Sequence, residues 1–161
     1  MNRYFKYDSN DDWETPIEYL ELLMPLLDKE ITIYDPFYFN GKVKQKWEKL
    51  GYKCIHNNED FYKVNKPNEF VHIVSNPPFH NKNEMLKKIF EWDLPFILLM
   101  PINTLSYMKT QKILKDKNIQ IIIPNIFKGF INMYGTQTKC PPFYLCYICY
   151  KMCLEKDITF L

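Results

Sequence analysis

The residues whose types and spacing could carry chemistry stand where two apolar runs stop. Ser75-Asn76-Pro77-Pro78-Phe79 directly follows the run 70–74, which is rich in β-branched residues and indicates a buried strand. Two successive prolines cannot continue a strand, because they lack N–H groups and hold φ at about −65°. Two acceptors, the Asn76 side-chain carbonyl and the rigidly directed Pro77 backbone carbonyl, then stand together and suit the two hydrogens of an amine.

The second such point is Asp35-Pro36-Phe37-Tyr38-Phe39-Asn40-Gly41, the turn between a predicted strand at 31–34 and a predicted helix at 41–50. In a doubly wound sheet this turn faces the ligand and usually needs glycine, so that the backbone can approach a nucleotide closely. Here only Gly41 is present. Taken alone, the turn is also typical of a plain strand-to-helix connection.

Strands and helices alternate around these two points. The periodicity predicts strands at 31–34, 52–56, 70–74, 96–100, 119–123 and 143–150, and helices at 15–27, 41–50, 83–92 and 108–117. The first helix is expected to open with a capping box, Thr15-Pro-Ile-Glu18, and to be kinked or shortened at Pro25.

This alternation predicts the α/β class, with right-handed crossovers and a doubly wound, mostly parallel sheet covered on both faces. No repeat, low-complexity tract or linker divides the 161 residues, so a single compact domain, 1–161, is expected. Ligands of such sheets bind outside the carboxyl ends of the strands, where the strand order reverses. Asp35 and Asn76 are both predicted on that edge.

In combination these motifs resemble those of the S-adenosylmethionine-dependent amino-methyltransferases, and specifically the N6-adenine nucleic-acid methyltransferases. Asp35, Pro36, Phe37 and Gly41 match the family's motif I (Asp-Pro-Phe-x-Gly-x-Gly), and Asn76, Pro77, Pro78 and Phe79 match its motif IV (Asn/Asp-Pro-Pro-Tyr/Phe) in full. Thr15-Pro16 is similar to motif X, which helps to hold the methionine end of the cofactor. Asp60-Phe61 is placed like the pair that contacts the cofactor's adenine. The resemblance implies a Rossmann-like class I methyltransferase fold, S-adenosylmethionine as cofactor and a DNA or RNA substrate.

The chemistry of motif IV follows from the substrate amine. The exocyclic nitrogen of adenine is a poor nucleophile because its lone pair is delocalised into the ring. Acceptors at Asn76 and Pro77 would bind its two hydrogens and favour an sp3-like nitrogen aimed at the methyl sulfonium. Phe79 would stack on a base taken out of a duplex. The step then needs no strong general base.

The chain departs from the family pattern at two places. Phe39 stands where motif I has its first glycine, and the strand 52–56 is followed by Asn57-Asn58 instead of the acidic residue that commonly takes the ribose hydroxyls. Glu59 or Asn57 could substitute. These departures leave a non-catalytic methyltransferase-like subunit, binding RNA or a catalytic partner, as an alternative. Another is a protein glutamine N5 methyltransferase, which also uses Asn-Pro-Pro-aromatic, although a glycine-rich motif I and an extra helical domain are missing here.

Target choice is expected to involve a protein partner, because no segment is long enough for a separate target-recognition domain. The loop 132–142 is the in-chain candidate for touching the substrate, or else an exposed hairpin connection. Lysine clusters at Lys42, Lys46, Lys49 and Lys53 and at Lys109, Lys112, Lys115 and Lys117 are either solvated helix faces or nucleic-acid contacts; the net charge of +2 does not itself demand a polyanion.

Composition bounds the class of protein. With 47% apolar and 17% aromatic residues the chain is expected to fold, and no apolar run approaches the roughly 20 residues of a membrane span. Residues 1–6 lack the apolar stretch of a signal peptide, and the five cysteines are an odd number, so a cytoplasmic or nuclear protein with reduced thiols is predicted. Cys146 and Cys149 are expected to point to opposite faces of a strand, so no metal site is predicted.

Overall fold

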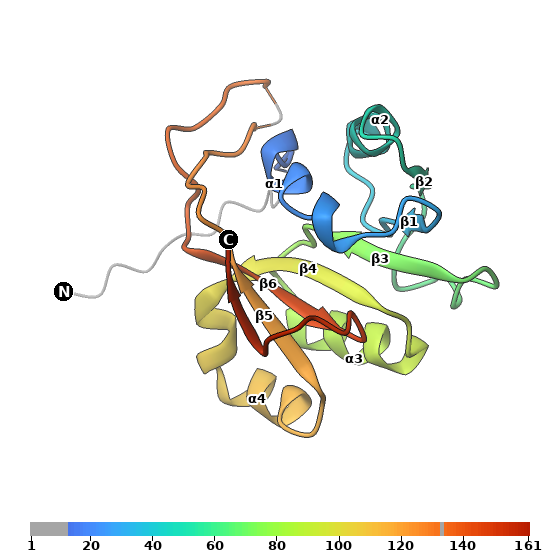
Figure 1. Ribbon diagram of the computed structural model, residues 1–161, viewed down its shortest axis with the longest axis vertical. Helices are drawn as coiled ribbons and strands as arrows, with labels where there is room; N and C mark the ends of the chain where they lie inside the picture. The colour runs from blue at the N-terminus through green and yellow to red at the C-terminus, as the bar shows by residue number, and fades with distance from the viewer. Residues whose placement is uncertain (1–12, 133) are drawn as a thin grey trace.

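Seven strands form one sheet in the order β2-β1-β3-β4-β6-β5-β7 (Figure 1). The computed structural model describes residues 13–132 and 134–161. The strands are β1 (Thr32–Tyr34), β2 (Lys53–Ile55), β3 (Val71–Ser75), β4 (Phe96–Pro101), β5 (Ile119–Ile123), β6 (Leu145–Tyr150) and β7 (Ile158–Phe160). β1 to β4 are parallel to one another, β6 is antiparallel to both β4 and β5, and β7 is parallel to β5. The predicted α/β class with a mostly parallel sheet is confirmed, and it is compatible with a Rossmann-like fold.

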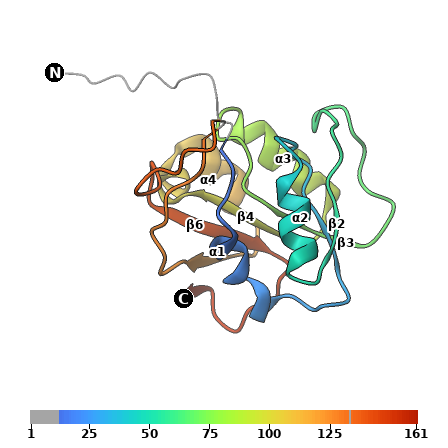
Figure 2. The same cartoon turned by 90° about the horizontal axis from the view of Figure 1, so that it is seen from above.

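The helices cover both faces of the sheet. They are α1 (Ile17–Glu21), α2 (Lys42–Lys49), α3 (Lys82–Trp92) and α4 (Met108–Leu114), with short 3-10 turns η1 (Met24–Leu26) and η2 (Ile102–Ser106). Figures 1 and 2 show α1 and α2 on one face and α3 and α4 on the other. Two separate apolar clusters correspond to these two layers. Every residue of β4 is buried, as a strand covered on both faces requires.

Alternation along the strands assigns side chains to the two clusters. Ile97 and Leu99 of β4 pack with α1 and α2, whereas Phe96 and Leu98 pack with α3. In β6, Cys146 belongs to the α3 cluster and Cys149 to the α1 cluster. The two thiols therefore lie on opposite faces, as their spacing in a strand predicts.

The strand order reverses between β1 and β3. From β1 the sheet extends to β2 on one side and through β3 to β4 on the other. Residues that follow β1 and β3 at their carboxyl ends are thus brought to the crevice where ligands of such sheets bind. Asp35 and Asn76 are the first residues of this kind.

The predicted first helix is wrong in both its length and its cap. α1 has 5 residues and is followed by η1, whose first turn contains Pro25. No side chain caps α1, because the Thr15 hydroxyl instead accepts a hydrogen bond from the Asn76 amide and Glu18 forms an ion pair with Lys128. The strand β7 and the turn η2 were not predicted, and the other boundaries differ by at most three residues from the predicted ones.

Other expectations concern the chain termini and the membrane. Residues 1–12, on which the absence of a signal peptide was argued, and Met133 within the loop 132–142 lie outside the described residues. Within the part of the chain that the structure describes, no helix combines the length and the apolar character that crossing a membrane requires.

Tyr147 provides a test of the core that leaves the candidate site intact. Its buried hydroxyl donates a hydrogen bond to the Tyr19 backbone carbonyl, with an oxygen-to-oxygen distance of 2.7 Å. Tyr147→Phe leaves that carbonyl unpaired and should lower the free energy of unfolding by about 1–2 kcal/mol in urea titration. Tyr144→Phe, at a ring that is 75% exposed, is the matched control and should change nothing. Equal loss in both variants would contradict this account.

Candidate functional site

Asp35 is buried at the carboxyl end of β1, where it joins the two candidate motifs. Its Oδ1 accepts a hydrogen bond from the Ser75 hydroxyl on the neighbouring strand β3 at 2.7 Å, and another from the Phe37 backbone N–H at 3.1 Å. The first bond links the end of β1 to the residue that precedes Asn76. The second folds the start of the β1–α2 connection back on the carboxylate. The turn after β1 and the end of β3 are therefore held together through one side chain.

Burial dominates the electrostatics of Asp35. It raises the pKa of this carboxyl group to about 6, against the charge of His56 and the hydrogen bonds from Ser75 and Phe37, which act to lower it. His56 follows β2, and its Nδ1 lies 2.9 Å from the Asp35 backbone carbonyl. The Tyr38 ring stacks on the imidazole, with ring centres 4.9 Å apart. His56 thus occupies the position after β2 with a ring packed against the motif I turn.

Asn76 presents a carbonyl oxygen that no described residue satisfies. Its Nδ2 donates a hydrogen bond to the Thr15 hydroxyl oxygen at 3.0 Å, which sets the orientation of the amide. The Oδ1 atom at the other end is buried and has no hydrogen-bond partner among the described residues. An unpaired buried acceptor costs roughly 1–3 kcal/mol, so native proteins keep few of them. The Asn76 oxygen is one of four such buried side-chain atoms among the described residues, and it belongs to a residue that lines the pocket described next.

A pocket of about 240 Å³ lies against the ends of β1, β2 and β3. Of the residues proposed to bind a cofactor, those that line it are Thr15, Asp35, Pro36, Phe37, Asp60 and Phe61; Asn76 and Pro78 of motif IV also line it. Two proposed residues do not: Pro16 is buried at the start of α1, and Gly41 begins the turn into α2. The structure thus brings most of the predicted residues to one place.

Gly41 has a local role. It adopts a φ of +75°, which glycine accepts without strain, and a Cβ there would lie 3.2 Å from the Tyr38 hydroxyl. Glycine is therefore needed for the turn into α2. Phe39, at the position of the missing motif I glycine, is half-buried and lines the pocket with its neighbours. Its ring narrows the pocket without filling it.

Aromatic rings form one wall of the pocket. The rings of Phe37 and Phe61 have centres 4.5 Å apart, and Phe61 also packs edge-on against Trp92. Lys88 of α3 fixes the loop that carries Phe61, because its Nζ donates to the backbone carbonyls of Phe61 and Val64 at 2.8 and 2.7 Å. This rigid apolar wall suits the flat face of a ligand.

Asp60 lies at the mouth of the pocket and is exposed. Its Oδ1 accepts a hydrogen bond from the Tyr62 backbone N–H at 3.0 Å, and its Oδ2 lies 3.3 Å from Lys63 Nζ. The first of these contacts, followed by the second, lowers the pKa of Asp60. The carboxylate is thus ionised and closes the turn that presents Phe61.

Pro77 and Phe79 face a different space from the rest of the predicted site. Together with Trp13, Asn76, Pro78, Phe130, Pro142 and Phe143 they line a hollow of about 20 Å³. That volume has room for about one water molecule. The ring of Phe79 meets that of Phe143 edge-on at 5.9 Å. Asn76 and Pro78 line both the pocket and this hollow.

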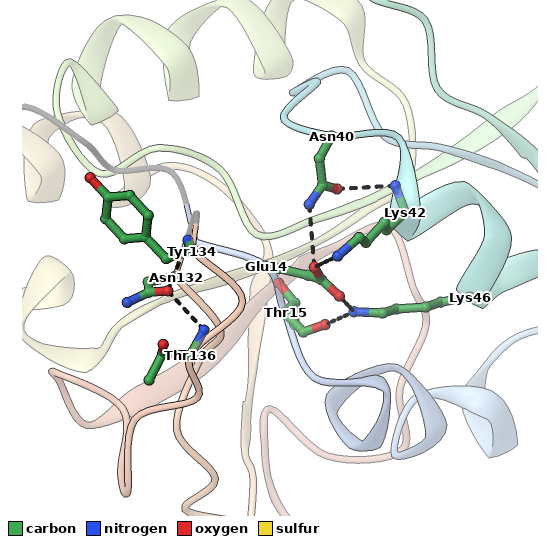
Figure 3. Close-up of polar contacts among 8 residues, drawn as sticks. All are labelled: Glu14, Thr15, Asn40, Lys42, Lys46, Asn132, Tyr134 and Thr136. Atoms are coloured by element: carbon green, nitrogen blue, oxygen red, sulfur yellow. Dashed lines mark hydrogen bonds and ion pairs between the residues drawn. The ribbon is translucent and has the colours of Figure 1, made fainter.

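Glu14 and Lys46 are members of the site that the sequence motifs did not single out (Figure 3). Glu14 accepts hydrogen bonds from Lys46 Nζ at 2.6 Å, Lys42 Nζ at 2.9 Å and Asn40 Nδ2 at 3.2 Å. Partial burial acts to raise the pKa of Glu14, but the bonds from Lys46 and Lys42 outweigh it and lower the pKa. The spacing of four residues aims both lysines at one carboxylate, with Lys46 17% and Lys42 54% exposed. Whether the lysines of α2 form a solvated face or contact nucleic acid stays a prediction.

The Glu14 segment also joins the site to the loop 132–142. The backbone of Glu14 pairs with that of Ile131 through two hydrogen bonds of 2.9 and 3.1 Å, and Lys46 Nζ donates to the Thr15 carbonyl at 2.6 Å. Asn132 Oδ1 accepts from the backbone N–H groups of Tyr134 and Thr136 (Figure 3). The start of this loop therefore lies beside the segment that orients Asn76.

In comparisons with known proteins, no family model and no curated protein matches the chain. Among residues 13–132 and 134–161, no group of three or more His, Cys, Asp or Glu side chains is placed to hold a metal ion. Function is therefore inferred from the geometry of the pocket and of Asn76.

The raised pKa of Asp35 predicts a defined dependence of stability on pH. The folded state keeps the Asp35 proton up to about pH 6, whereas the unfolded chain releases it near its ordinary value of 3.8. The favourable contribution is therefore complete below about pH 4 and is lost as the pH rises through 6, by up to about 3 kcal/mol. Asp35→Asn cannot ionise, so its unfolding free energy should gain on the wild type between pH 4 and 7 in urea titrations. If the difference in unfolding free energy between the variant and the wild type were constant over this range, the raised pKa of Asp35 would be ruled out.

Proposed function

We propose that this protein transfers a methyl group from S-adenosylmethionine to the exocyclic N6 amine of adenine in DNA or RNA. The observation that carries the proposal is the buried, unpaired Oδ1 of Asn76. It is supported by the position of this atom at the reversal point of the sheet, beside the pocket, and by the resemblance of residues 76–79 to motif IV.

Asn76 and Pro77 are the groups that would hold the amine. The Thr15 hydroxyl keeps the Asn76 amide in the orientation that leaves its oxygen to accept a hydrogen bond. The peptide carbonyl of Pro77 is directed by the two prolines. Two acceptors on a primary amine remove both hydrogens from the plane of the base and localise the nitrogen lone pair, which prepares it for attack. Thr15 thereby acts as a positioning residue for Asn76.

The side chains that line the pocket support S-adenosylmethionine as its ligand. Its lining includes the rings of Phe37, Phe39 and Phe61, the carboxylates of Glu14, Asp35, Glu59 and Asp60, and Lys46, which is paired with Glu14. Carboxylates and aromatic faces favour a ligand with cationic groups and a flat heterocycle. When bound, the cofactor supplies a methyl group activated by a sulfonium. Phe37 and Phe61 would hold the heterocycle, and the carboxylate of Asp35 the charged part.

A non-catalytic subunit with the same fold is the second candidate function. The observation that favours it is the hollow of about 20 Å³ between Phe79 and Phe143, which is too small for a base. A measurement of cofactor binding distinguishes the enzyme from the non-catalytic subunit poorly, because a subunit that has lost catalysis can still retain the pocket. Methyl transfer to a nucleic acid is therefore the deciding readout.

Asn76→Ala tests the role of the unpaired oxygen. Because this oxygen is expected to bind the substrate amine, the variant should lose methyl transfer by at least about 100-fold and keep its affinity for S-adenosylmethionine and S-adenosylhomocysteine within a few-fold. Tritium transfer to DNA and RNA gives the first quantity and calorimetry the second.

Two controls make this result interpretable. Asn118→Ala, at an exposed residue before β5, should match the wild type in both measurements. Asp35→Ala should lose cofactor binding. Unchanged turnover in Asn76→Ala would contradict the mechanism, and cofactor binding without transfer to DNA or RNA by the wild type would favour the non-catalytic subunit.

Thr15→Val tests the positioning of Asn76. Without the hydroxyl, the Asn76 amide loses the contact that fixes its orientation, so turnover at saturating S-adenosylmethionine should fall by about 10-fold. Thr15→Ser restores the hydroxyl and should recover most of the rate. If Thr15→Val and Thr15→Ser were equally active, the hydroxyl would have no part in orienting the amide.

A further inference from the structure

A row of aromatic and basic side chains runs along the carboxyl edge of the sheet, beyond motif IV. Lys82 Nζ lies 3.8 Å from the centre of the Tyr107 ring, and the Ile102 N–H donates to the Tyr144 carbonyl at 2.8 Å. The rings of Tyr144 and Phe127 have centres 5.5 Å apart and are tilted by 30°. These five residues, Lys82, Ile102, Tyr107, Phe127 and Tyr144, are called the aromatic rim.

The rim is exposed and continuous with the candidate site. Tyr144 is 75% and Phe127 53% exposed, although both are large rings in contact with each other. Phe143, the neighbour of Tyr144, packs against Phe79 of motif IV. In Figure 1 the segments that follow β4 and β5 and the one that precedes β6 gather at the same side of the molecule. Adjacent exposed rings of this kind mark a surface that binds something.

The charge of this part of the chain is one-sided. Between Leu94 and Leu154 the only carboxylate side chain is that of Asp116, which precedes β5 and so lies at the opposite edge of the sheet. Lys109 follows the rim residue Tyr107, and Lys128 follows Phe127 and pairs with Glu18. The rim therefore combines cations with exposed ring faces, and Glu84, two residues after Lys82, is paired with Lys87. The pocket on the other side of Asn76 is lined by four carboxylates and by Lys46.

We propose that the aromatic rim binds single-stranded nucleic acid, with bases stacked on Tyr144 and Phe127 and phosphates near Lys82 and Lys109. Stacking on rings and attraction to cations are the two terms that hold single strands. A duplex keeps its base faces stacked on one another and cannot use the rings. The rim begins beside Phe79 and offers exposed rings and cations, so it is the path along which a strand that brings an adenine to Asn76 would leave. The path of the nucleic-acid strand from Asn76 to the rim rests on the proposed function.

Fluorescence anisotropy with a labelled adenine-containing oligonucleotide tests the rim on the full chain. The single strand, as DNA and as RNA, should bind at least 10-fold more tightly than its duplex. The double variant Phe127→Ala/Tyr144→Ala should weaken this binding by at least about 10-fold, since each stacked base contributes substantially. Tyr144→Phe keeps the ring and should bind normally. Phe70→Ala removes a ring that is 72% exposed directly before β3, at the opposite edge of the sheet, and should also bind normally.

Several outcomes would contradict the proposal that the rim binds single-stranded nucleic acid. These are equal binding by the double variant, preference for the duplex, or self-association of the wild type that the double variant abolishes, which would make a second copy the occupant. Failure of the proposed function gives a different result. If binding depends on the rim but no methyl transfer occurs, the proposal for the rim is retained and the proposed function fails. If methyl transfer depends on Asn76 and the double variant leaves it unchanged, the proposed function is retained and the proposal for the rim is contradicted.

Discussion

The candidate site depends on the adjacency of β1 and β3, which one hydrogen bond fixes where the two strands end. Ser75 donates to the buried carboxylate of Asp35 at 2.7 Å, so the residues that follow each strand have a defined position relative to each other. Because the strand order reverses here, the two connections diverge to opposite faces, one into α2 and one into α3. The space between them becomes the pocket, and Asn76 stands at its edge.

Around Asn76 the protein presents two chemically different surfaces. The first is the pocket, which is lined by carboxylates and by an aromatic wall that Lys88 fixes. The second is the aromatic rim, where exposed rings lie near lysines. The amide of Asn76 lies at the boundary, with its nitrogen bound to Thr15 and its oxygen unpaired.

The sheet, and the edge at which Asp35 and Asn76 lie, could be predicted from the sequence because the signals involved are local. Short apolar runs stopped by Asp35-Pro36 and Asn76-Pro77 indicate buried strands and where they end. What it could not show are contacts across long separations: Asn76 to Thr15 is 61 residues, and Lys46 to Glu14 is 32. The capping box failed for this reason, since a distant amide competes for the Thr15 hydroxyl. β7 has three residues, two of them exposed, and has no pattern that marks it without β5 beside it.

The position of β6 has a consequence for how the protein is made. β6 lies between β4 and β5, so the sheet stays divided until residues 145–150 have been synthesised. Tyr147 on this strand then bonds to the backbone of Tyr19, 128 residues earlier, and Glu14 pairs with Ile131. Such distant pairings slow folding, because the chain loses much entropy before it gains their contacts. During synthesis the half-built sheet exposes the apolar edge of β4, and in this interval it is prone to aggregate or to need a chaperone.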